Sequence, residues 1–364
     1  MQADRRKFLE NLMAAWCPSG FEEEAQEIVR ARLAPQADEL RTDVHGNVLA
    51  GINTKAALRV MLAGHVDEIG LMISHIDDNG FLYFQTIGGF DPSVVAGQQV
   101  IIHGAKGPVP GVIGRKAIHL MTDEERKAAP RIEDMFIDIG ARDGKEAKQS
   151  VRVSDPATLN VSLQYLLGDR VSSRGFDDRI GAFVVVETLL EVARRRPRVA
   201  LWSVSTVQEE VGLRGAKTSA FGIDPHVGIA VDVGHASDYP AAEKDKRKLG
   251  DIRVGNGPML CRGPNINAAV EKGLEKVAAA KRIPFQIQAE PRATGTDANA
   301  IQLNRAGVAT ALVSVPNRYM HTPVEVISLT DADNTIRLLA EYVLSLKPGD
   351  TFIPMAAKRA GRGK

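Results

Sequence analysis

The feature that most constrains the fold of this chain is a change of pattern in its middle. At both ends, short apolar runs typical of buried strands alternate with longer helical segments, as in LRVMLAG at 58–64 and DDRIGAFVVVETLLEVARR at 177–195. From about residue 74 to about residue 167 the pattern changes to short β-rich runs separated by glycine and proline. The ends therefore predict an α/β domain, and the middle predicts a small all-β domain, barrel or sandwich, inserted into it.

These patterns divide the chain into two domains and a tail. We expect an α/β domain over residues 1–73 and 168–348, and an inserted β domain over residues 74–167. A chain of 364 residues also exceeds the usual size of a single hydrophobic core, which favours two domains on length alone. The basic stretch 349–364 is expected to be a tail without a specific role.

Composition narrows the class of protein. The formal net charge is +1, which gives no electrostatic reason for binding nucleic acid or an anionic membrane surface. The two cysteines, Cys17 and Cys261, lie far apart and lack the spacing of a metal or redox motif. A disulfide framework is therefore not expected, and a cytoplasmic location is.

The N-terminal region predicts two helices. The segment MQADRRKFLENLMAAW mixes charges into its apolar positions, so we expect an amphipathic helix and neither a signal peptide nor a membrane span. Ser19 followed three residues later by Glu22 has the pattern of a capping box, which predicts the start of a second helix.

Carboxylates and imidazoles follow several of the apolar runs or begin a helix after them. They are His65 and Asp67 in GHVDEIG, Asp177 and Asp178 in GFDDRIG, Glu209 and Glu210 in QEEVG, Asp232 in VDVG, and His321 in RYMHTPVEV. In open α/β sheets, groups beyond the carboxyl ends of the strands converge on one edge. Histidine and carboxylate side chains gathered there are the ligand set of a two-metal hydrolytic site.

His65 and Asp67 are two residues apart on an extended segment and point to the same side. Asp67 can then accept the second ring N–H of His65 and fix the tautomer of a metal-binding imidazole. For the next pair, Asp178 lies nearest a helix start, so capping competes with metal binding there. Asp177 is the better ligand, and its two oxygens allow it to bridge two ions.

Glu209 and Glu210 end a buried strand, where unpaired carboxylates are costly. Adjacent side chains at a strand end diverge, so one can bind metal while the other acts as a general base. Asp232 follows an apolar strand and is either a cap or a metal ligand. His321 is weak evidence on its own, but it supplies the imidazole that the set otherwise lacks.

Several motifs of other enzyme classes are absent from the sequence. It contains no HExxH, no GxSxG, no GxxxxGK[ST], and no GxGxxG with a suitable acidic residue after it. Serine hydrolases, P-loop nucleotide hydrolases and dinucleotide-dependent enzymes are therefore unsupported.

The order HxD, DDR, QEEVG, Asp and MHTP resembles the tetrahedral aminopeptidases, the glutamyl and deblocking aminopeptidase family of binuclear metallopeptidases, some of which were once described as endoglucanases. The similarity covers nearly the whole chain, through the motifs PSGFE, GHVDEIG, FDDRIG, QEEVGLRGA, GTDANAIQ and RYMHTPVEV. Related zinc exopeptidases place their extra domain later in the chain. An insertion between Asp67 and Asp177 therefore favours the tetrahedral family, which implies a zinc-exopeptidase-like mixed sheet flanked by helices, with the β insert barrel-like.

The resemblance also implies the ligands. Two divalent metal ions, zinc or cobalt, would be held in each subunit by His65, Asp177, Glu210, Asp232 and His321. Asp177 would bridge the two ions, with His65 and Asp232 on the first and Glu210 and His321 on the second.

The catalytic roles are implied in the same way. Glu209 would be the general base, which takes a proton from a water bridging the two ions, and Asp67 would orient His65. The implied function is removal of N-terminal amino acids from short peptides by a large homo-oligomer, a dodecamer built from dimers. Two other functions stay open: an endoglucanase-type glycosidase, and a metal-bound oligomeric scaffold without catalytic activity.

Overall fold

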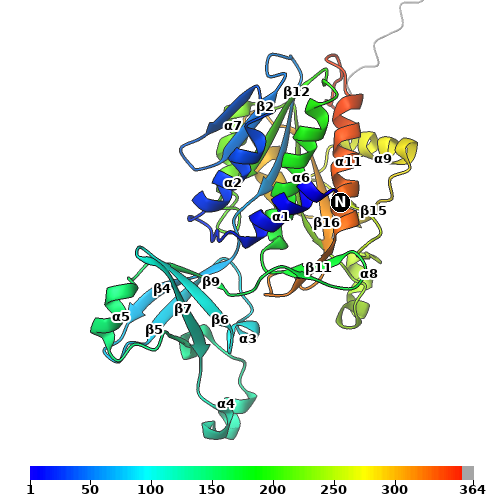
Figure 1. Ribbon diagram of the computed structural model, residues 1–364. Coiled ribbons are helices and arrows are strands. Elements are labelled where there is room, and N and C mark those ends of the chain that lie inside the picture. Colours follow the sequence, from blue (N-terminus) through cyan, green and yellow to red (C-terminus); the bar gives the residue numbers. More distant parts are fainter. Residues whose placement is uncertain (355–364) are drawn as a thin grey trace, which may run out of the picture.

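A mixed sheet of eight strands forms the centre of the larger domain (Figure 1). The computed structural model describes residues 1–354, so most of the predicted tail lies outside the described residues. In spatial order the strands are β1 (Glu39–Thr42), β2 (Val48–Ile52), β12 (Ala200–Thr206), β3 (Arg59–His65), β13 (Val227–His235), β16 (Ala309–Asn317), β14 (Met259–Arg262) and β15 (Gln286–Ala289). The four central strands β12, β3, β13 and β16 are parallel to one another, so their carboxyl ends meet at one edge.

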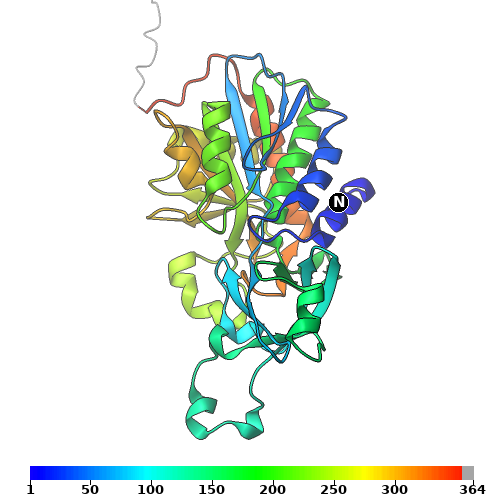
Figure 2. The ribbon, with the colours of Figure 1, turned by 90° about the vertical axis from the view of Figure 1, so that its left-hand side faces the viewer.

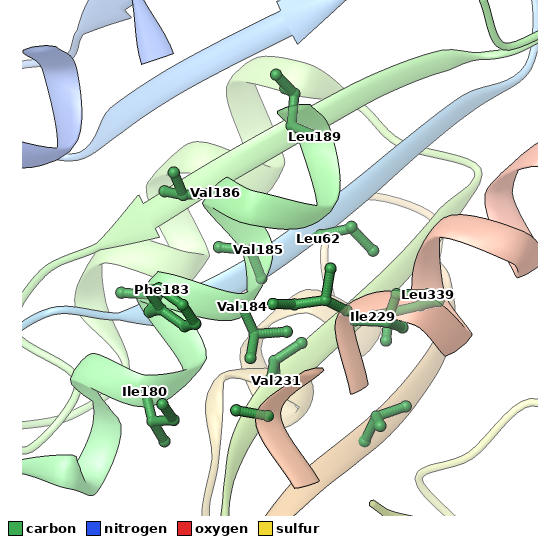
Figure 3. Close-up of a cluster of buried hydrophobic side chains, with 14 of the residues drawn as sticks. Leu62, Ile180, Phe183, Val184, Val185, Val186, Leu189, Ile229, Val231 and Leu339 are labelled. Atoms are coloured by element: carbon green, nitrogen blue, oxygen red, sulfur yellow. The ribbon is translucent and has the colours of Figure 1, made fainter. Parts of the chain in front are cut away.

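Helices cover both faces of this sheet. They are α1 (Ala3–Ala14), α2 (Glu23–Leu33), α6 (Phe176–Ala193), α7 (Arg214–Ile223), α9 (Ala268–Lys281), α10 (Asp297–Gln302) and α11 (Leu329–Ser345). The short helix α8 (Lys246–Leu249) and a 3₁₀ turn over Pro240–Asp245 lie in the connection between β13 and β14. Alternate residues of β3 serve the two faces: Val60 and Leu62 pack in the core with α6 and α11, and Met61 and Ala63 pack in the core with α7 and α10. Figure 3 shows the first of these cores, with Leu62 of β3 close to the apolar side chains of α6.

Helix α6 is the central helix of the domain, and glycines let it approach β3 closely. A Cβ atom built on Gly64 would lie 2.4 Å from the carbonyl carbon of Gly181, so no side chain fits at that point. The end of β3 and the start of α6 are thereby brought together. His65 ends that strand, and Asp177 lies in the first turn of that helix.

The insert is a closed six-stranded barrel. Its strands, in order around the barrel, are β4 (Gly70–Ile76), β5 (Leu82–Ile87), β8 (Phe136–Asp138), β7 (Gly107–Gly114), β6 (Gln99–Gly104) and β9 (Pro156–Leu159). Short helices join them: α3 (Pro92–Val95), α4 (Asp123–Lys127), α5 (Gly144–Ser150), and 3₁₀ turns over Ile118–Leu120 and Ile132–Asp134. The barrel has a hydrophobic core of its own, and the loop that carries α4 extends away from it (Figure 2).

A small antiparallel sheet lies where the chain returns from the barrel. It consists of β10 (Gln164–Tyr165), β11 (Arg170–Ser173) and β17 (Glu325–Ser328), with Ser173 opposite Glu325. Strand β11 leads directly into α6, and β17 follows the loop that contains His321. Two segments far apart in the sequence therefore meet beside the edge of the main sheet.

The predicted fold, a mixed sheet flanked by helices with an inserted barrel-like domain, is confirmed. The domain boundaries stay a prediction; the barrel strands themselves run from Gly70 to Leu159. The N-terminal segment forms α1, which buries one apolar side of the helix. Among the described helices, none combines the length and the apolar character needed to cross a membrane.

Candidate metal centre

The predicted site residues lie at the edge where the four central parallel strands end. His65 is the last residue of β3, and Glu209 and Glu210 lie in the turn after β12. His321 lies in the loop between β16 and β17. Asp232 differs from expectation in one respect, because its strand β13 continues for three residues beyond it to His235.

Asp177 lies between the two imidazoles. Its Oδ1 is 3.2 Å from Nε2 of His65, and its Oδ2 is 3.3 Å from Nε2 of His321. Glu210 is on the same side, with its Oε1 3.5 Å from Nε2 of His321. The donor atoms of His65, Asp177 and Glu210 all lie within 4.8 Å of one another, which is close enough to share a metal ion.

A second group of three donors consists of His65, Asp178 and Asp232, again within 4.8 Å. Both oxygens of Asp178 already accept backbone hydrogen bonds, Oδ2 from the N–H of His65 at 3.2 Å and Oδ1 from that of Gly181 at 3.0 Å. Asp178 follows Asp177 through a cis peptide bond. The hydrogen bond from Gly181 is the contact expected at the start of a helix. Because both oxygens of Asp178 are engaged, Asp177 and Asp232 have the carboxylate oxygens that are more available to a metal ion.

The carboxylate of Asp67 has a different principal contact from the one predicted. The nearest acceptor to Nδ1 of His65 is the backbone carbonyl of Asp67 at 3.0 Å, whereas its Oδ1 lies 3.5 Å away. The carboxylate accepts hydrogen bonds from the backbone N–H groups of Glu209 at 3.1 Å and Glu210 at 3.2 Å. Asp67 therefore orients the imidazole chiefly through its main chain, and its side chain holds the two glutamates.

The predicted capping box at the start of α2 is wrong. The Ser19 hydroxyl donates instead to Oδ2 of Asp67 at 2.6 Å, and α2 begins without a side-chain cap. Glu22 accepts the N–H groups of Gly20 and Gln208. The Ser19 hydroxyl is thus taken by the carboxylate of Asp67, and the Glu22 carboxylate connects the start of α2 to the segment before Glu209.

Burial and mutual repulsion dominate the electrostatics of the cluster. Burial raises the pKa of Glu209 to about 10, with a further contribution from the charge of Asp232. Burial likewise raises the pKa of Asp232, and the charge of Asp177 adds to it. The pKa of Asp177 is lowered in spite of its burial, because both imidazoles stabilise its charge. The hydrogen bond to Asp177 raises the pKa of His321 to about 9.

The cluster is therefore rich in buried negative charge. Within residues 1–354, no lysine or arginine forms an ion pair with Asp67, Asp177, Asp178, Glu209, Glu210 or Asp232. The Oε1 atom of Glu210 is buried and has no hydrogen-bond partner in the described part of the chain. Buried carboxylates of this kind need compensating cations, and a histidine and carboxylate donor set suits divalent zinc or cobalt.

Comparison with known proteins decides the family. A family model described as M42 glutamyl aminopeptidase matches residues 46–338. The chain belongs to the M42 glutamyl aminopeptidase family. The resemblance inferred from the sequence motifs is thereby confirmed, and membership supports aminopeptidase activity, which is hydrolysis of peptide bonds.

Individual relatives of this M42 chain agree with that assignment. A lysyl aminopeptidase of Pyrococcus furiosus is 38% identical, over 92% of this chain and 95% of the relative. A TET aminopeptidase from a marine-sediment Thaumarchaeota archaeon has a TM-score of 0.90 and 35% identity, covering 94% of this chain and 97% of that one. The TET1 peptidase of Pyrococcus horikoshii, which can assemble into a tetrahedron or a large octahedral shell, has a TM-score of 0.84 and 29% identity, covering 94% and 100%.

Two groups at the M42 site were missed by the sequence analysis. Glu325 is 1% exposed and accepts the backbone N–H groups of Asp177 and His321. It lies within the motif RYMHTPVEV, where an acidic residue between two valines could have indicated a buried carboxylate with a specific partner. The carbonyl of Gly89, in the barrel, lies 2.9 Å from Nδ1 of His321. No side-chain pattern reveals a backbone acceptor.

Proposed function

We propose that this M42 family member is a metal-dependent aminopeptidase that removes N-terminal amino acids from short peptides. One observation carries the proposal: Asp177 directs one carboxylate oxygen to each of two imidazoles, at 3.2 and 3.3 Å, inside a buried acidic cluster. A carboxylate placed between two imidazoles, with one oxygen toward each, is suited to bridging the ions of a two-metal hydrolytic site.

The proposed ligands divide into two sets that share Asp177. His65, Asp177 and Asp232 would hold one divalent ion, and Asp177, Glu210 and His321 would hold the other. Zinc and cobalt are the proposed ions, since both accept imidazole and carboxylate donors. Two such ions, when bound, lower the pKa of a water and polarise the scissile carbonyl.

The side chains supply the proton transfers. Glu209 is proposed as the general base, since it adjoins the ligand Glu210 and its Oε2 is 3.8 Å from Nε2 of His65. It would accept the proton of the attacking water and deliver it to the leaving amine, because bound cations would favour its charged form against the burial that raises its pKa. The Asp67 carboxylate, which accepts the N–H groups of both glutamates, would keep the base and the ligand in a fixed relative position.

We also propose that the protein is a cytoplasmic homo-oligomer, a dodecamer built from dimers. Assembly of the Pyrococcus horikoshii relative into a tetrahedron supports this proposal. Residues 74–167 would provide dimer contacts and control access. Exposed apolar side chains on the loop that extends from the barrel, Ile118 at 62% and Leu120 at 71%, favour a contact role for it. The free cysteines Cys17 and Cys261 suit a reducing compartment.

Activity assays with and without a chelator test the proposed function. Hydrolysis of an aminoacyl chromogenic amide should be lost after metal removal and restored by zinc or cobalt. Hydrolysis of carboxymethyl cellulose that survives the chelator would instead favour the glycosidase alternative, whose two carboxyls need no metal. Stable metal binding without activity on any aminoacyl amide or peptide would favour the scaffold.

A further inference from the structure

The carboxylate of Glu325 joins the two loops that carry the proposed metal ligands Asp177 and His321. Its Oε2 accepts the backbone N–H of Asp177 at 3.0 Å, and its Oε1 accepts that of His321 at 3.0 Å. Asp177 and His321 are separated by more than a hundred residues in the sequence. One side chain therefore fixes the distance between their backbones.

The surrounding strands hold Glu325 in place for this contact. It is the first residue of β17, and it is paired with Ser173 of β11. Strand β11 leads within four residues to Asp177, whereas β17 follows the His321 loop. The antiparallel ladder thus sets the two segments side by side, and the carboxylate connects them at the end nearest the metal centre.

The His321 loop needs such a contact because its backbone conformation is unfavourable for a residue with a side chain. Tyr319 and His321 both adopt left-handed backbone conformations, with φ of 63° and 59°. The ring of His321 is held separately, through Nδ1 and the carbonyl of Gly89. Glu325 is the side chain that holds the main chain of His321.

We propose that Glu325 is a positioning residue that sets the spacing between Asp177 and His321 and so maintains affinity for the ion held by Asp177, Glu210 and His321. This inference rests on the proposed function. Glu325 is 1% exposed, and both of its oxygens are engaged by backbone N–H groups, so it acts through these ligands. Groups that orient metal ligands commonly change metal affinity by roughly 10–100-fold when they are replaced.

The variant Glu325→Gln tests the proposal, because an amide can accept from only one of the two N–H groups. Asp331→Asn is the matched control. Asp331 is also buried, and its two oxygens accept the N–H groups of Gly255 at 2.6 Å and Gly257 at 2.7 Å, in a network that contains none of the proposed ligands. Both substitutions remove one acceptor for a backbone donor, but Glu325→Gln does so beside the metal centre.

Metal content is the decisive measurement. Wild-type protein, Glu325→Gln and Asp331→Asn are dialysed against buffered zinc over a range of free concentrations, and zinc per subunit is measured by plasma mass spectrometry. Cobalt titration followed by visible absorption gives the affinities of the two sites without an activity assay. We expect two ions in the wild type and in Asp331→Asn, and weaker binding of one ion in Glu325→Gln, by roughly 10–100-fold.

A further readout separates positioning from general damage. Saturating metal should return the kcat of Glu325→Gln close to that of the wild type, since the proton-transfer group is untouched. Two ions bound to Glu325→Gln with wild-type affinity, parallel weakening of both ions, or a kcat that saturating metal does not restore would each overturn the proposal. If Glu325→Gln does not accumulate as folded protein, Glu325→Asp is judged by the same measurements. A wild-type protein that binds fewer than two ions would count against the proposed function instead.

Discussion

The carboxylate of Glu68 accepts a hydrogen bond from the guanidinium of Arg179 at 3.1 Å, with the two side chains only 2% and 0% exposed. Arg179 also donates to the backbone carbonyls at the end of α1, including that of Ala15 at 2.6 Å. Arg174 binds the same carboxylate. One buried ion cluster therefore ties α1, the segment after His65 and the first turn of α6 together.

Replacing Arg179 by Met should destabilise the protein by about 3–5 kcal/mol, because it leaves the buried Glu68 with one charged partner and removes donors from several carbonyls. The control is Arg131→Met, since the Arg131–Asp134 pair is exposed and solvent screens its attraction. Urea unfolding of both variants measures the difference. Similar midpoints for both would mean that the buried cluster adds little.

Replacing Glu209 by Gln should lower kcat by at least about 10²-fold, because the variant lacks the proposed general base. Metal content should stay at the wild-type value, since the proposed ligands are intact. Turnover of an aminoacyl amide and plasma mass spectrometry provide the two readouts. Loss of an ion from this variant would require the roles of Glu209 and Glu210 to be exchanged.

Replacing Asp177 by Ala should weaken both metal sites, because one side chain is proposed to serve both ions. Zinc titration of the variant should give less than one tightly bound ion per subunit. Asp232→Ala is the comparison, since it removes a proposed ligand of one ion only. If Asp177→Ala still bound two zinc ions per subunit, Asp177 could not be the bridging ligand.

Replacing Glu22 by Gln should change how stability depends on pH. Burial raises the pKa of Glu22 from its ordinary 4.5 to about 7, and the charge of Asp67 adds to the shift. Between pH 4.5 and 7 the folded protein then binds more protons than the unfolded chain, so stability falls as pH rises through this window. Across this window the free energy of unfolding should fall by about 3 kcal/mol at most.

The amide of Glu22→Gln can keep both hydrogen bonds of the carboxylate, since the N–H groups of Gly20 and Gln208 share the single acceptor Oε1. The stability of the variant should therefore not fall between pH 4.5 and 7. Relative to the wild type, the variant should become more stable as pH rises to 7 and above. Unfolding of metal-stripped protein at a series of pH values measures this difference. A difference that is constant from pH 4 to pH 8 would contradict the assigned shift.

The sequence was sufficient for the layers of the fold, and it named the histidines and carboxylates that the fold brings together at one sheet edge. Apolar runs predicted the central strands of the main sheet, and the change of pattern predicted an inserted all-β domain, barrel or sandwich. His65 and His321 could be proposed as ligands because they follow strands and belong to a set of motifs in a fixed order. Asp177 could be preferred to Asp178 as the proposed ligand because the position nearest a helix start favours capping, and Asp178 does accept the N–H of Gly181.

The remaining contacts depend on tertiary structure. Ser19 has the spacing of a cap, yet its hydroxyl binds Asp67, because the folded chain places a charged acceptor next to it. Glu325 contacts backbone N–H groups of two distant segments, and such groups carry no sequence signal. The carboxylate of Asp67 likewise accepts hydrogen bonds from the backbone N–H groups of Glu209 and Glu210. Side-chain spacing does not reveal main-chain partners.

The acceptor for Nδ1 of His321 is the carbonyl of Gly89, which belongs to the barrel. The insert therefore contributes an atom to the environment of a proposed metal ligand. Because this carbonyl accepts a hydrogen bond from a protonated Nδ1, it favours the tautomer of His321 that leaves Nε2 free for a metal ion. A change in the barrel that displaced the loop at Gly89 would therefore reach the proposed metal ligand His321, although the barrel has a hydrophobic core of its own.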